Sequence, residues 1–171
     1  CNGENNGKIS VDISGGTLPY TYSWTGPSSY TNSSKSIQQL YPGTYHLTVI
    51  DSLNCQISES YSIVQPQILV LSGVSNDNLC YGESNGQIST IVSGGIKPYQ
   101  FNWSNGKTTQ NLNLLSAGNY NLTVSDSNNC IVSKSFTIVS PTKLSLSNSS
   151  LNVKCYGQNS GSITLFASGG T

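Results

Sequence analysis

Five cysteines are the residues of this chain whose type and spacing could do chemistry: Cys1, Cys55, Cys80, Cys130 and Cys155. Protein thiols of this kind either bind zinc or oxidise to disulfides. A zinc site needs cysteines and histidines at close spacing. Here the nearest two cysteines are 25 residues apart, and the chain holds 1 histidine. The spacing therefore disfavours a metal site and leaves disulfide formation as the expected chemistry.

Seven carboxylates could bind calcium only if several of their oxygens converged on one point. Asp51 and Asp126 recur in the motif Asp-Ser-x-Asn-Cys, and Glu4 and Glu83 recur in a second motif. Each motif offers only one or two acids, and a turn aspartate commonly bonds its own backbone. We therefore expect capped turns and solvated acids rather than a metal site at Glu4, Asp12, Asp51, Glu59, Asp77, Glu83 or Asp126.

The sequence shows no catalytic triad and no phosphate-binding motif. His46 alternates with apolar residues and has no Ser or Cys motif that would complete a triad. Paired glycines such as Gly94–Gly95 lack the Lys-Ser/Thr that follows a phosphate-binding loop, and they suit a turn that needs positive φ. The sequence therefore predicts no enzyme, no catalytic residue and no cofactor.

Aromatic residues gather in a stretch that occurs twice, as SGGTLPYTYSW (Ser14–Trp24) and SGGIKPYQFNW (Ser93–Trp103). They alternate with other residues, so they share one face of a strand. Such a face could stack on sugar rings, or it could form the core of a β-sandwich, where a strand tryptophan is usual. We expect the core reading, with Trp24 and Trp103 at the centre.

An internal repeat organises all of these motifs. The pattern C-x-G-x-x-x-G-x-I starts at Cys1, Cys80 and Cys155, and SGG follows each time. We predict three repeats, at 1–66 (lacking its first strand), 67–141 (complete) and 142–171 (the opening only). Because the chain begins and ends inside repeats, we expect it to be part of a longer protein.

Each repeat is a succession of short segments with period-two alternation and no helical period. In the motif L-x-x-G-x-Y-x-L-T-V-x-D, Tyr45 and Tyr120 occupy the place of a tyrosine corner, where a phenol ties its strand to the preceding turn. The polar segments Thr25–Gln39 and Ser104–Leu114 differ in length, as surface loops do. The pattern predicts an all-β chain of tandem immunoglobulin-like β-sandwiches.

The composition excludes several classes of partner. Charged residues make up 8% of the chain and the net charge is zero, so the clustered basic face of a nucleic-acid-binding protein is absent. No apolar run reaches the length of a membrane span. The expected partners are neighbouring repeats of the same chain and, through the variable segments, a surface polysaccharide or other substratum.

Three motifs follow one another in a fixed order: C-x-G-x-x-x-G, then SGG-x-x-PY-x-x-x-W, then L-x-x-G-x-Y-x-L-T-V-x-D with its closing cysteine. In this order they resemble SprB-type repeats, and the resemblance covers essentially the whole chain. Those repeats build large surface adhesins of gliding bacteria of the Bacteroidota. The resemblance implies an extracellular, cell-surface protein, exported by the type IX pathway, that serves in gliding motility or attachment. Such repeats also occur in surface proteins that need not glide, so it supports an adhesin or stalk better than motility.

The cysteine pairing stays open at this stage. Counting pairs Cys1 with Cys55 and Cys80 with Cys130, and leaves Cys155 for a partner outside the chain. The strand order of an immunoglobulin-like sandwich instead puts the two cysteines of one repeat at opposite ends, too far apart to bridge. A head-to-tail array would then favour Cys1 with Cys130, between repeats.

Two other functions compete with an adhesive array whose role is mechanical. A carbohydrate-binding module would need exposed aromatics, so both tryptophans would stand in water. An accessory region of a secreted enzyme would need its catalytic part elsewhere. We expect the variable segments, Thr25–Gln39 and Ser104–Leu114, to make any ligand contact because they alone change length between repeats.

Overall fold

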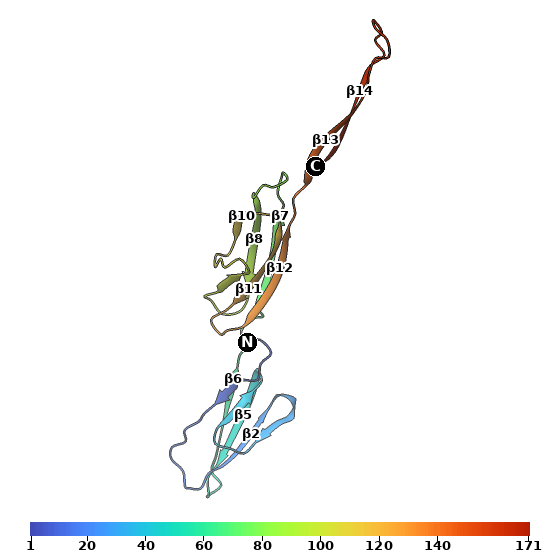
Figure 1. Ribbon diagram of the computed structural model, residues 1–171. Coiled ribbons are helices and arrows are strands. Elements are labelled where there is room, and N and C mark those ends of the chain that lie inside the picture. The colour runs from blue at the N-terminus through green and yellow to red at the C-terminus, as the bar shows by residue number, and fades with distance from the viewer. The chain divides into compact units, whose positions relative to one another are not determined.

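The computed structural model describes residues 1–171 and consists of strands and turns, with no α-helix. The strands form two compact units, shown in blue to cyan and in green to red in Figure 1. The first unit comprises Cys1–Ile68 and Gly94–Ile96, and the second comprises Leu69–Ser93 and Lys97–Thr171. The all-β class predicted from the alternation is confirmed.

The first unit contains two sheets. Strands β1 (Gly7–Ile9) and β4 (Ile37–Leu40) form a two-stranded antiparallel sheet. The other sheet has the order β3-β2-β5-β6. Its strands are β2 (Thr21–Gly26), β3 (Tyr30–Asn32), β5 (Gly43–Ile50) and β6 (Gln56–Ile63), and a 3-10 turn at Pro27–Ser29 joins β2 to β3.

The sandwich of the second unit repeats this plan, with β7 added and no counterpart of β3. Its sheets have the orders β10-β8-β7 and β12-β11-β9. The strands are β7 (Val70–Asn76), β8 (Gly86–Ser93), β9 (Gln100–Trp103), β10 (Leu112–Leu115), β11 (Gly118–Ser125) and β12 (Ile131–Ile138). Two three-stranded antiparallel sheets facing one core make the immunoglobulin-like sandwich that the sequence predicts.

Alternation along the strands builds one core in each unit. In β5, Tyr45, Leu47 and Val49 are buried while His46 is exposed. The inward side chains surround one tryptophan in each unit: Trp24 among Ile9, Val11, Ile37, Leu40, Tyr45, Leu47 and Val49, and Trp103 among Leu71, Ile88, Leu112, Leu115, Leu122, Val124, Phe136 and Ile138. Both clusters follow from the period of two.

The variable segments are not simple loops, which corrects one sequence expectation. Their last residues form β4 and β10, which pair with β1 and β8. The buried pairs Ile37 with Leu40, and Leu112 with Leu115, are spaced by three residues rather than two. A residue with positive φ, Gln39 or Leu114, lies in each strand and the register shifts there, so an irregular strand turns both apolar residues inward.

The end of the chain forms a hairpin, β13 (Thr142–Leu151) with β14 (Ser162–Gly170), in brown to red in Figure 1. Every residue of β13 is exposed, as are Ile163, Leu165 and Phe166 of β14. The equivalent hairpin in the second repeat is β7 with β8, which belongs to one sheet of the sandwich. The β13–β14 hairpin has these two strands but not the second sheet that would cover them.

Candidate functional site

No group of three or more His, Cys, Asp and Glu side chains lies close enough together to hold a metal ion. No helix is long and apolar enough to span a membrane. The one histidine, His46, is exposed and its Nδ1 lies 2.8 Å from Ser60 Oγ across the β5–β6 pair.

The aromatic stretch lies in the core rather than on a binding face. Trp24 is fully buried and its Nε1 donates to Ser34 O at 2.9 Å. Trp103 is 2% exposed and its Nε1 donates to Thr109 O at 2.8 Å. Each indole therefore ties the following variable segment to the sandwich, so neither ring is available for a sugar.

Both tyrosine corners are formed. Tyr45 Oη donates to Tyr41 O at 2.9 Å, and Tyr120 Oη donates to Ser116 O at 3.0 Å. Tyr45 is buried, and Tyr120 is partly buried against the second core. Burial is the main cause that raises the pKa of Tyr45 above its ordinary value, with Tyr30 nearby adding to it. These phenols fix the turns that precede β5 and β11.

The recurring aspartates close their own turns. Asp51 Oδ1 accepts from the backbone N–H of Leu53 and Cys55 at 2.9 Å each, and Oδ2 accepts from Thr17 N at 2.9 Å. Asp126 is 2% exposed, and its Oδ1 accepts from Asn128 N and Cys130 N in the same way. Turn capping thus explains why the motif Asp-Ser-x-Asn-Cys recurs.

The other carboxylates make local contacts that differ from one another. Glu4 accepts from the N-terminal amine of Cys1 at 3.0 Å, and Asp12 pairs with Lys35 at 3.1 Å. Asp77 accepts from Val139 N at 2.9 Å, and Glu83 accepts from Asn85 Nδ2 at 2.7 Å. Glu59 lines a cleft described below.

Acid should weaken the first unit through Asp51. Hydrogen bonds from the backbone of Thr17 and Cys55 lower the pKa of this carboxyl below its ordinary value in the folded state. Its stabilising contribution is therefore present above the unfolded-state pKa and is lost as the pH falls through the lower folded-state pKa. We expect Asp51→Asn to flatten the fall in urea midpoint between pH 5 and pH 2. Parallel curves for the variant and the wild-type chain would contradict this.

Asn78 is a positioning residue that the sequence analysis did not identify. Its side chain is 4% exposed; Oδ1 accepts from Asn85 N and Gly86 N at 3.0 and 2.6 Å, and Nδ2 donates to Ser140 Oγ at 2.9 Å. It thereby joins the Cys80 loop to the start of β8 and to the end of β12. The equivalent residue, two positions before Cys155, is Val153. An asparagine at this position is therefore not part of the repeated pattern, and the sequence does not indicate its role.

Removing the Asn78 side chain should leave two backbone N–H groups without their acceptor. We expect Asn78→Ala to lower the free energy of unfolding by about 1–3 kcal/mol. The matched control is Asn76→Ala, an exposed asparagine at the end of β7, which should change stability by less than about 0.5 kcal/mol. Equal losses in urea denaturation would show that Asn78 has no special role.

The two cysteines of each repeat lie at opposite ends of its sandwich. In the first repeat, the Cys1 loop is bonded to the chain after β6, because Asn2 Nδ2 donates to Pro66 O and Gly3 N donates to Gln65 Oε1. Cys55 instead directly precedes β6. In the second repeat, the Cys80 loop is anchored beside Val139, after β12, and Cys130 directly precedes β12. A strand of 8 residues spans roughly 26 Å.

The intra-repeat pairs expected from counting are therefore not formed. Cys55, Cys80 and Cys155 are free and exposed, whereas Cys1 and Cys130 are disulfide-bonded. The physical reason is length, since bridged Cα atoms lie within about 7 Å of each other. The free Cys55 and Cys80 exclude both Cys1–Cys55 and Cys80–Cys130.

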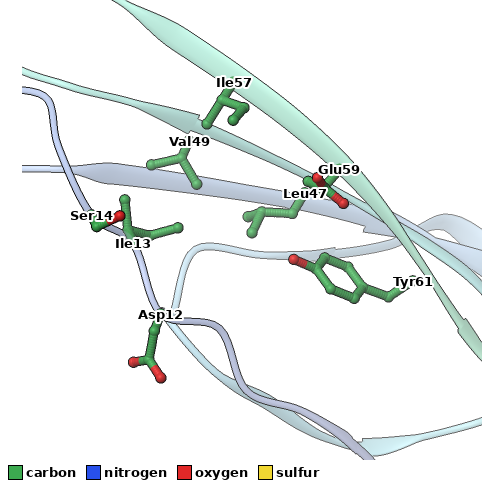
Figure 2. Close-up of a pocket in the computed structure, with 8 residues that line it drawn as sticks. All are labelled: Asp12, Ile13, Ser14, Leu47, Val49, Ile57, Glu59 and Tyr61. Atoms are coloured by element: carbon green, nitrogen blue, oxygen red, sulfur yellow. The ribbon is translucent and has the colours of Figure 1, made fainter.

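A cleft of about 330 Å³ opens on the first unit between the segment that follows β1 and the strands β5 and β6. Figure 2 shows Ile13, Leu47, Val49 and Ile57 lining it together with Tyr61, and Asp12, Ser14 and Glu59 at its margins. Leu47 and Val49 belong to the core, while Ile57 is 59% exposed. The cleft thus reaches the core of the sandwich from one side.

Comparisons with known proteins place the chain in a family. The family model for the SprB repeat matches residues 1–29, 72–108 and 147–171, more than half of the chain. A solved structure described as "Structure of amphioxus IgVJ-C2 molecule" is similar at 14% identity and a TM-score of 0.34, over 79% of this chain and 97% of that chain. No curated protein matches. The motifs, the repeated Trp-centred sandwich and the family match together identify the chain as a member of the SprB repeat family.

Proposed function

We propose that this chain is a structural and adhesive repeat region of a large secreted bacterial surface adhesin, used in attachment or gliding. One observation carries the proposal: the same Trp-centred sandwich is built twice from a repeated sequence of the SprB family. The features that the two copies share serve packing and turn geometry. The role that fits such units is to extend the protein and bear load, not to catalyse a reaction.

Ligand contact belongs, in this proposal, to the variable segments. In the first repeat, residues 25–36 expose most of their side chains, including Thr31, Asn32, Ser33 and Ser34. In the second repeat, residues 104–111 are all exposed. Each segment has one lysine, Lys35 or Lys107. The other polar side chains carry hydroxyl and amide groups, which suit hydrogen bonding to a surface polysaccharide.

The repeat boundaries at 1–66, 67–141 and 142–171 are part of the same proposal. Two features support them. The first unit has no counterpart of β7, and the β13–β14 hairpin has no counterpart of the other strands.

We further propose that disulfides join successive repeats, with Cys1 bonded to Cys130. Cys1 lies at the end of the first sandwich from which the chain leaves, and Cys130 lies at the opposite end of its own sandwich. In a head-to-tail array these are the two ends that meet. The same rule assigns Cys80 to the Asp-Ser-x-Asn-Cys turn of the third repeat, and gives Cys55 and Cys155 partners in flanking repeats.

Surface labelling of intact cells tests the proposed location and role. Antibodies raised against this chain should label unpermeabilised cells that produce it, and Fab fragments directed at residues 25–36 should reduce attachment to a polysaccharide-coated surface. Fab fragments directed at Ser58 and Ser60 on the exposed face of β6 are the matched control. Labelling that requires permeabilisation would overturn the surface location.

A further inference from the structure

The cleft of the first unit lies where the second unit places β7. In the second repeat β8 runs through 8 residues, Gly86–Ser93, and pairs with β7 from Gln87 to Ser93. The equivalent strand β1 stops at Ile9 after 3 residues, although the sequence continues with the same alternation through Val11 and Ile13. The backbone of residues 10–14 is therefore an edge without a paired strand.

The burial of β12 and of its equivalent β6 also indicates that a strand is missing beside the cleft. In the second repeat, β12 packs beside β7, and its Phe136 and Ile138 are 5% and 1% exposed. The equivalent residues of β6, Tyr61 and Ile63, are only partly buried. Ile57, which corresponds to the partly buried Val132, is 59% exposed and lines the cleft. The first unit therefore presents apolar surface that a strand covers in its sister repeat.

The second repeat also defines what kind of strand fits. Leu71 lies opposite Val92 and is buried, and Gly73 lies opposite Thr90. A Cβ on Gly73 would come within 2.5 Å of Ser89 O and 3.1 Å of the Phe136 ring. Only glycine passes over that ring, so the fitting pattern is Leu-x-Leu-x-Gly, as in Leu69–Gly73.

We propose that the cleft of the first unit is a strand-binding site for an extended segment of the protein's own repeat type, of the kind that residues 67–77, with β7, represent. The strand lies antiparallel to residues 8–14, with its second leucine opposite Ile13 and its glycine opposite Val11, over Tyr61. Its backbone pairs with the open edge, and its leucine closes the core, as in other β-augmentation sites.

Binding of a synthetic peptide of residues 67–77 to the 171-residue chain tests the site. The labelled peptide should bind saturably, as read by fluorescence anisotropy. A peptide with Leu71→Asp should bind at least tenfold more weakly, because a carboxylate would enter the core. The natural peptide 142–152, which has Asn148 in place of the glycine, should also bind at least tenfold more weakly.

Two matched variants of the chain locate the binding. Ile57→Asp, in the cleft, should weaken peptide binding at least tenfold. Leu53→Asp, at a residue 69% exposed in a turn outside the cleft, should leave it unchanged. Both residues are exposed, so neither change should unfold the unit, and near-wild-type circular dichroism of each variant checks this.

A chain with residues 67–79 fused ahead of Cys1 makes the second test. The fused strand should occupy the cleft, abolish binding of the free peptide and raise the denaturation midpoint of the first unit. Unchanged peptide binding by the fused chain, equal binding of the 67–77 and 142–152 peptides, or no saturable binding at all would each overturn the proposal. None of these outcomes depends on where the protein resides or what it adheres to, so the adhesin proposal stands or fails separately.

Discussion

Trp103→Ala should lower the free energy of unfolding of the second sandwich by about 3–5 kcal/mol, the range for a large aromatic removed from a packed core. Trp103 is 2% exposed, and its ring centroid lies 5.7 Å from that of Phe136. Its Nε1 also holds Thr109 O, so the variable segment is released when the indole is lost. Trp24→Ala should have an effect of the same order in the first unit, where Tyr61 is the aromatic neighbour.

Denaturant unfolding monitored by far-ultraviolet circular dichroism measures this effect. Ile91→Ala is the matched control, because Ile91 points out of β8 and is 68% exposed; it should cost less than about 0.5 kcal/mol. If Trp103→Ala and Ile91→Ala unfold at the same midpoint, the indole does not hold the sandwich together.

Cys1→Ser and Cys130→Ser should each lower the free energy of unfolding of the oxidised chain by about 3–5 kcal/mol. Under the proposed pairing the bond closes a loop of 130 residues, for which loop-closure entropy gives roughly 5 kcal/mol, an upper figure because folded-state strain subtracts from it. The bond forms when two thiols lose two protons and two electrons to glutathione disulfide, which yields two glutathione thiols. Cys80→Ser and Cys155→Ser, at exposed free cysteines, should change stability little.

Tryptic mapping under non-reducing conditions identifies the bonded partners directly. Cleavage after lysine puts Cys1 in a peptide of residues 1–8, Cys55 and Cys80 together in 36–107, because Lys97 precedes proline, and Cys130 in 108–134. We expect a linked pair of 1–8 with 108–134 that separates on reduction. A linked pair of 1–8 with 36–107 would contradict the inter-repeat pairing.

Overlap between successive bonds gives the pairing its mechanical consequence. Applied to a longer array, the rule makes the loop from Cys1 to Cys130 overlap the next loop, which starts at Cys80. Every peptide bond between the first and the last bonded cysteine of the array then lies inside at least one disulfide-closed loop. A single cut between Pro66 and Gln67 should leave the two parts joined on a non-reducing denaturing gel and separate them after reduction.

The fold was predictable because each strand shows its inward face through a period of two. The aromatic stretch ending at Trp103 and the Gly-x-Tyr motif at Tyr120 each pointed to a packing role that the side chains have. The irregular strands at Gln39 and Leu114 were not predictable, since a bulge converts a period of two into a spacing of three.

The candidate site was less accessible from sequence. Asn78 acts through three hydrogen bonds made across the fold, and nothing in its local pattern or in the other repeats marks it. That the cleft lacks a covering strand is recognised only when the burial of Ile57 and Tyr61 is compared with that of Val132 and Phe136. Counting along the chain paired Cys1 with Cys55, whereas the strand order expected of the sandwich already put the two cysteines of a repeat at opposite ends, as the structure has them.

Force spectroscopy on the 171-residue chain, held by handles fused to both ends, tests most directly whether folded repeats joined by a disulfide carry the load. Under reducing conditions the chain should resist extension until its sandwiches unfold in discrete events. Under oxidising conditions residues 2–129 should stay shielded, so the fully stretched chain should be shorter by roughly 450 Å. Equal lengths in both conditions, or stretching without any unfolding event, would contradict the account.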